Sequence, residues 1–118
     1  MSYDLGLCDP TTGEELELDT PHQMRGGTYQ IGGCPRAHFN ITWNYGRHLQ
    51  RVLGVDGIRT IYGKTGGESM PILEAAIAIL ADDVDPDYWE GTEGNTKLAL
   101  CNLLKLAKMR PEGVWNGD

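Results

Sequence analysis

The sequence is poor in the features that would tie it to a membrane or to an oxidising compartment. Its three cysteines, Cys8, Cys34 and Cys101, are odd in number and far apart, so a disulfide framework is not expected. No apolar run approaches the length of a membrane span, and the first residues, MSYDLGLCD, lack the basic and apolar regions of a secretory signal. These absences predict a cytoplasmic protein.

Positive charge is also scarce in this chain. Ten Lys and Arg residues stand against 17 Asp and Glu residues, which gives a net charge of −7. A chain with this balance has little general attraction for a phosphate backbone or for an anionic bilayer, so neither nucleic acid nor a membrane is an expected partner. Its 118 residues fit a single globular domain, residues 1–118, and its 16 glycines predict many turns.

The most informative stretch of the sequence is a glycine-rich polar turn that leads into an apolar helix. Ser69 is a suitable cap for the first turn of this helix, and Pro71 is tolerated inside that turn. From there to Ala81 the only polar residue is Glu74. A helix that is apolar nearly all round is expected to be buried on most sides, so residues 69–81 are predicted to form the central helix.

Hydrophobic periodicity elsewhere predicts an α+β fold in which antiparallel strands come first and pack against three helices. Alternating apolar residues indicate a hairpin and then two more short strands, over residues 3–7, 15–18, 28–31 and 37–43. The helical period indicates a helix on each side of the central one, over residues 45–54 and 93–109. The last residues, 111–118, read as a tail with one apolar anchor, Trp115.

Two motifs resemble known ion or phosphate sites but fail on spacing. Gly63-Lys64-Thr65 lacks a glycine at position 58, where a nucleotide-hydrolysing P-loop requires one. A non-catalytic anion contact by Lys64 stays open, beside a plain loop with a solvated lysine. In the acidic run 82–93, Pro86 interrupts the curl that a calcium loop needs, so this run is expected to be a solvated connector.

Metal ligands and catalytic groups do not assemble into a recognisable motif. Cys34 and His38 are four residues apart, and His22 and His48 are the other imidazoles, but no second pair of ligands has zinc-site spacing. We therefore expect no bound metal, no cofactor, no catalytic residues and no enzymatic activity.

Polar and aromatic side chains gather instead in three turn regions, over residues 25–29, 40–45 and 59–65. Aromatic faces can stack a base, amides can read its edge, and cations can hold a phosphate. The alternative is that these groups only satisfy hydrogen bonds at strand ends. The candidate ligand-binding residues are Arg25, Thr28, Asn44, Tyr45, Arg59, Tyr62, Lys64 and Thr65.

Five segments, TPHQMRGGTY, NITWNYGRHLQRVLG, GIRTIYGKTG, YWEGTEGNTKLAL and AKMRPEGVW, resemble a family of small phage- and prophage-encoded proteins. The resemblance covers nearly the whole chain but brings no assigned activity and no known catalytic residues. It implies a small viral protein that acts in the cytoplasm of a bacterial host cell. Many such proteins counter host defence, either by sequestering a nucleotide immune signal or by binding a defence protein.

Two functions follow from this context and the residues. The first is a phage-encoded, non-enzymatic binding protein that sequesters an anionic nucleotide-type small molecule, acting as a sponge for a bacterial immune signal. The alternative is an inhibitor that binds a host defence protein through its acidic surface, with residues 82–93 imitating nucleic-acid phosphate. An enzyme that acts on a nucleotide has the least support, and homo-oligomerisation stays open.

Overall fold

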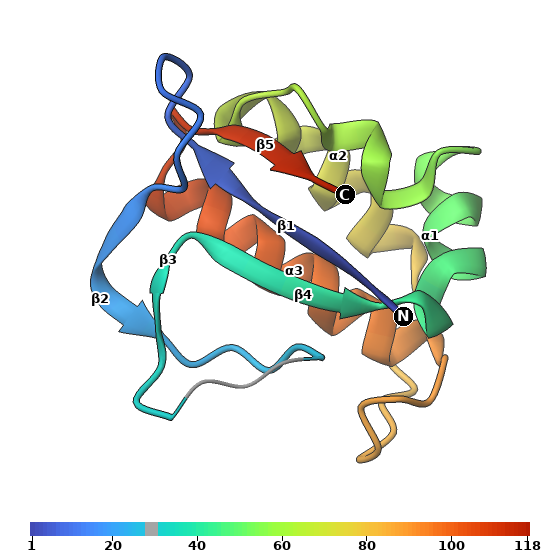
Figure 1. Ribbon diagram of the computed structural model, residues 1–118. Helices are drawn as coiled ribbons and strands as arrows, with labels where there is room; N and C mark the ends of the chain where they lie inside the picture. Colours follow the sequence, from blue (N-terminus) through green and yellow to red (C-terminus); the bar gives the residue numbers. More distant parts are fainter. Residues whose placement is uncertain (28–30) are drawn as a thin grey trace.

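Strand β1 (Ser2–Cys8) is the middle strand of a three-stranded antiparallel sheet in the computed structural model, which describes residues 1–27 and 31–118 (Figure 1). It pairs with β4 (His38–Thr42) on one side and with β5 (Val114–Gly117) on the other. The register sets Leu5 opposite Phe39 and Leu7 opposite Trp115. All four of these side chains are buried, so the alternation seen in the sequence marks the face that the helices cover.

The predicted hairpin between residues 3–7 and 15–18 is wrong in its pairing. A turn does form, because the carboxylate of Asp9 accepts hydrogen bonds from the backbone N–H groups of Thr11 and Thr12. Pairing stops after one bridge between Cys8 and Glu15. The chain then continues into β2 (Glu17–His22), whose partner is β3 (Cys34–Arg36) in a separate two-stranded sheet.

The last segment of the chain is a strand rather than the expected tail. Trp115 of β5 is fully buried, and its backbone N–H donates to the carbonyl of Lys64 at 2.9 Å. Of the other predicted strands, 37–43 corresponds to β4, whereas Ile31 lies in a turn and residues 28–30 fall outside the described part of the chain.

The α+β class with three α-helices is confirmed for the described residues. Helix α1 (Gly46–Leu53) ends at Gly54, whose φ of 103° is a conformation that favours glycine. Helix α3 (Glu93–Met109) has the predicted bounds and is capped by Thr92. Short 3-10 turns, η1 (Trp43–Tyr45) and η2 (Gly57–Ile61), lead into α1 and follow it.

Helix α2 (Gly66–Ile79) begins earlier than predicted, because Thr65 caps it instead of Ser69. The hydroxyl of Thr65 accepts from the N–H of Glu68 at 3.0 Å, and the carboxylate of Glu68 accepts from the N–H of Thr65 at 2.9 Å. This reciprocal pair is a capping box. Pro71 consequently lies in the helix interior and not in the first turn.

The expectation that residues 69–81 form a helix buried on most sides is also wrong. Helix α2 buries one stripe, represented by Leu73 and Ala76, while Ile79 at its end is 58% exposed. Helix α3 is more deeply buried, with Leu100 and Leu103 fully inaccessible. Figure 1 shows why: α3 runs behind β1 and β4, and α2 packs beside it. No helix in the described ranges is long and apolar enough to cross a membrane.

Candidate ligand-binding site

The acidic loop of residues 81–92, which joins α2 to α3, is held in one conformation by the buried side chain of Asn95. The amide oxygen of Asn95 accepts from the N–H of Asp85 at 2.9 Å. Its amide nitrogen donates to the carbonyls of Asp87 and Glu90 at 2.9 and 3.1 Å. A single side chain thus fixes both limbs of the loop, which is more than the solvated connector expected from the sequence.

Three carboxylates of this loop accept hydrogen bonds from the backbone of the loop or of the first turn of α3. Asp83 accepts from the N–H of Gly94, Asp85 from that of Asp87, and Asp87 from that of Trp89, at 2.8 to 3.0 Å. A Cβ at Gly94 would meet the backbone of Asp83 and Val84 at 2.5 Å, so only glycine allows the loop to approach the helix this closely. The acidic run is therefore a rigid part of the surface.

Two tyrosines fasten the loop to the sheet and to η1. The hydroxyl of Tyr88 accepts from the N–H of Thr42 at 3.0 Å and donates to the carbonyl of Asn40 at 3.3 Å. The hydroxyl of Tyr45 donates to the carbonyl of Tyr88. Burial raises the pKa of both Tyr45 and Tyr88, so both hydroxyls stay protonated at neutral pH and remain donors.

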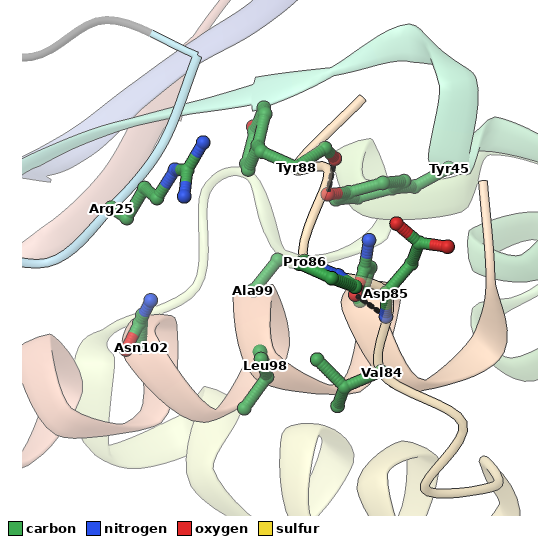
Figure 2. Close-up of a pocket in the computed structure, with 10 residues that line it drawn as sticks. Arg25, Tyr45, Val84, Asp85, Pro86, Tyr88, Leu98, Ala99 and Asn102 are labelled. Carbon is green, nitrogen blue, oxygen red and sulfur yellow. Dashed lines mark hydrogen bonds between the residues drawn. The ribbon is translucent and has the colours of Figure 1, made fainter. Parts of the chain in front are cut away.

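A cavity of about 360 Å³ opens between this loop, helix α3 and the segment before residue 28 (Figure 2). Its volume lies in the range of small-molecule pockets, about 300–1,000 Å³. Its lining consists of Arg25, Tyr45, Val84, Asp85, Pro86, Tyr88, Asn95, Leu98, Ala99 and Asn102.

Polar groups lie on two sides of the cavity. Figure 2 shows the guanidinium of Arg25 and the amide of Asn102 on one side, and Val84, Pro86 and the carboxylate of Asp85 on the other. The guanidinium carbon of Arg25 lies 5.8 Å from the centroid of the Tyr88 ring. The amide group of Asn95 is already hydrogen-bonded to the loop. Arg25 and Asn102 are therefore the lining residues on this side that could donate hydrogen bonds to a ligand.

Of the residues predicted to bind a ligand, the structure brings two together in this cavity, Arg25 and Tyr45. Asn44 lies nearby but has another task, since its amide donates to the carbonyl of Trp89 at 2.8 Å and so helps to hold the loop. Thr28 lies outside the described residues. The first two turn regions of the prediction therefore contribute to one place.

The third predicted region lies elsewhere. The guanidinium of Arg59 sits over the ring of Tyr3, 5.3 Å from its centroid, and its Nε donates to the carbonyl of Asp118 at 2.9 Å. The hydroxyl of Tyr62 is buried and has no hydrogen-bond partner among the described residues. Burial raises the pKa of Tyr62 to about 12. Neither Arg59 nor Tyr62 lines the cavity.

Lys64 and Thr65 are likewise separate from the cavity. Thr65 is occupied as the cap of α2, and its hydrogen bonds to Glu68 lower the pKa of that carboxyl group. The carbonyl of Lys64 receives the N–H of Trp115 from β5. The glycine-rich turn thus links α2 to the sheet.

The sequence prediction missed most of the cavity lining. Asn95 and Asn102 are seven residues apart, so they lie on one face of α3, and Leu98 and Ala99 lie between them. The signal that could have indicated this place is a pair of amides on one face of α3, of which Asn95 is buried and Asn102 is partly buried. The contribution of Tyr88 and Pro86 depends on the loop conformation, which no local pattern reveals.

The histidines are engaged within the protein. The Nδ1 atom of His38 lies 2.6 Å from a carboxylate oxygen of Glu15, and its Nε2 atom lies 3.4 Å from one of Asp4. The Nε2 atoms of His22 and His48 contact the carbonyls of His38 and Gly91 at 2.7 and 2.8 Å. Within residues 1–27 and 31–118, no three His, Cys, Asp or Glu side chains form a group that could hold a metal ion, and all three cysteines are free thiols.

No family model matches the chain, and no curated protein and no solved structure is significantly similar to it.

Proposed function

We propose that this protein is a non-enzymatic binding protein that sequesters a small anionic molecule of nucleotide type in the cavity between the 81–92 loop and α3. The observation that carries the proposal is the composition of that cavity, in which apolar side chains accompany the guanidinium of Arg25, the carboxylate of Asp85 and the amides of Asn95 and Asn102. Small-molecule sites generally have this character, with a mainly apolar lining and a few polar groups that fix orientation. The guanidinium of Arg25 supplies the contact for an anionic group.

The roles already taken by the polar lining residues favour binding over chemistry. Tyr45 and Tyr88 spend their hydroxyls on the loop and the sheet. Asp85 accepts from the N–H of Asp87, and Asn95 holds both limbs of the loop. These are the interactions of a rigid receptor, which lowers the entropic cost of ordering the site when a ligand binds.

The origin implied by the resemblance extends the proposal to a biological role. A phage-encoded protein with such a cavity would act in the cytoplasm of the bacterial host by lowering the free concentration of a nucleotide immune signal. Sequestration requires no turnover, only enough protein and a dissociation constant below the concentration of the signal.

A second candidate function rests on a different observation, the exposed apolar residues of the acidic loop. Trp89 is 49% exposed and Val84 is 51% exposed, although the backbone that carries them is rigidly held. An aromatic side chain on a fixed loop surrounded by carboxylates suits a protein partner with basic groups. In this case the protein would inhibit a host defence protein.

Native mass spectrometry of the protein purified from phage-infected cells separates the two functions. If the protein is a binding protein, we expect one retained small molecule per protein molecule. The Asn102→Leu variant, which places an apolar side chain on the side of the cavity that holds Arg25, should lose this molecule. A protein that co-purifies instead, and is released by Trp89→Ala but not by Asn102→Leu, would replace the binding proposal with the inhibitor.

A further inference from the structure

We infer that the ligand of this cavity carries a single negative charge on a flat, largely apolar body. The inference rests on the proposed function and narrows it to one class of ligand. It follows from the two charged groups of the cavity lining and from the apolar side chains that lie opposite Arg25.

The cavity offers one cation. Arg25 is the only Lys or Arg residue in its described lining. Two basic residues of the neighbouring helices α1 and α3 are engaged in ion pairs, since Lys97 lies 2.6 Å from a carboxylate oxygen of Asp82 and Arg51 lies 2.7 Å from one of Glu93. One guanidinium pairs with one phosphodiester or carboxylate group, and a second anionic group on the ligand would find no cation.

A negative charge also lines the cavity. Asp85 belongs to the lining, and Asp83, Asp87 and Glu90 lie elsewhere in the same loop. Backbone N–H groups donate hydrogen bonds to the carboxylates of Asp83, Asp85 and Asp87 and keep them in place. We therefore expect this loop to repel a second negative charge on the ligand.

The apolar side chains in the cavity lining indicate the shape of the uncharged part of the ligand. Val84 and Leu98 are 51% and 50% exposed, and the ring of Pro86 lies beside them in the lining. Covering these side chains with a flat ring system removes apolar surface from water and is favourable. The volume of about 360 Å³ is near the lower end of the range for such pockets, which suits one base with its sugar better than a dinucleotide.

A 3′,5′-cyclic mononucleotide has this chemistry, because its phosphodiester carries one negative charge beside a planar base. An aromatic carboxylate shares the same chemistry without a sugar. Calorimetric titration of the intact protein with cyclic AMP, cyclic GMP, 1-naphthoate, the polyanion ATP and neutral adenosine distinguishes these classes.

The expected result is that at least one monoanion binds and that ATP and adenosine each bind more weakly by on the order of tenfold or more. The Asp85→Asn/Asp87→Asn variant, which keeps an acceptor oxygen for each loop N–H, should reduce the preference over ATP several-fold. Binding of 1-naphthoate but of neither cyclic nucleotide would assign the site to carboxylates.

Two other outcomes overturn the inference in different ways. If ATP binds as tightly as the monoanions, or more tightly, the single-charge inference is wrong while the cavity remains a nucleotide site. If none of the five compounds binds, although circular dichroism shows a folded protein, the proposed function itself fails and the inference fails with it.

Discussion

The indole Nε1 of Trp115 donates a hydrogen bond to the hydroxyl oxygen of Ser69 at 2.8 Å, and both residues are fully buried. The hydroxyl of Ser69 in turn donates to the carbonyl of Gly66 at 2.8 Å. This chain joins the last strand, β5, to the first turn of α2 through the interior of the protein. Ser69 therefore does not cap the helix, as its position suggested, but satisfies a buried donor from the other end of the chain.

Replacing Ser69 by alanine should lower the free energy of unfolding by about 1–3 kcal/mol, because the buried N–H of Trp115 would lose its acceptor. Urea unfolding followed by circular dichroism measures this loss. In a double-mutant cycle with Trp115→Phe, which removes the donor, the cost of Ser69→Ala should be clearly smaller. Equal costs in both backgrounds would show that the hydrogen bond contributes nothing to stability.

The deeper burial of α3 predicts where truncation is costly. Leu103 of α3 is fully buried, so Leu103→Ala should cost about 2–5 kcal/mol through lost contacts and a cavity. Ile79 at the end of α2 is 58% exposed, and Ile79→Ala should stay within about 0.5 kcal/mol. Thermal unfolding of both variants tests the comparison. If Ile79→Ala costs more stability than Leu103→Ala, then α2 rather than α3 contributes more to the core.

Local patterns in the sequence were sufficient for the class of fold and for the bounds of two helices. They failed at the start of α2, although the pattern Thr65-x-x-Glu68 is present, because Gly66 and Gly67 disfavour a helical first turn. They also failed for β5, whose four residues form a strand only because β1 offers an unpaired edge more than a hundred residues earlier. A pairing of that range leaves no local periodicity.

The candidate site shows the same limit. Arg25 and Tyr45 were identified as ligand-binding candidates from their residue types, but the cavity that unites them depends on Asn95 folding the acidic loop over α3. Lys64 was singled out because of its glycine neighbours, but the role of Gly66 is to let the chain pass close to the carbonyl of Arg110 at the start of α2. Residue types identified two residues of the cavity lining but not the place of the cavity in the fold.

Tyr62 predicts a loss of stability at alkaline pH. Burial raises the pKa of Tyr62 to about 12, above the value of about 10 for an unfolded chain. Between these values the unfolded chain releases the proton while the folded protein keeps it, so the free energy of unfolding falls as pH rises from about 10 to about 12. Urea unfolding at several pH values should show a smaller fall for Tyr62→Phe than for the parent protein.

At neutral pH the same Tyr62→Phe variant should be as stable as the parent or more stable by roughly 1 kcal/mol, because it removes a buried hydroxyl without a partner. If Tyr62→Phe instead lowers the free energy of unfolding at neutral pH by more than about 1 kcal/mol, the hydroxyl of Tyr62 makes a hydrogen bond in solution. The alkaline and neutral measurements use one variant and separate the two effects.

Asn95 should control the order of the acidic loop. Asn95→Asp keeps the oxygen that accepts from Asp85 but removes both hydrogen bonds donated to loop carbonyls. We expect faster amide hydrogen exchange over residues 85–89 and a loss of about 1–3 kcal/mol of stability. Asn102→Asp is the matched control, since it makes the same chemical change two turns later on α3. Similar exchange in both variants would show that Asn95 does not hold the loop.

The cavity predicts unequal roles for Arg25 and Lys64, two of the three cations singled out in the sequence. Arg25 lines the cavity, whereas Lys64 does not, so the substitutions Arg25→Gln and Lys64→Gln remove the same charge from two different places. For a monoanionic ligand identified by calorimetry, Arg25→Gln should weaken binding by about 10- to 100-fold, the value of one charge-assisted hydrogen bond. Lys64→Gln should change binding less than about twofold, because Lys64 is not part of the cavity lining and salt screens charges that do not contact the ligand. The parent protein should lose affinity as salt rises, and the Arg25→Gln variant should lose less. A larger effect at Lys64 than at Arg25 would move the site to the start of α2, and equal losses would mean that the ligand senses only the overall charge.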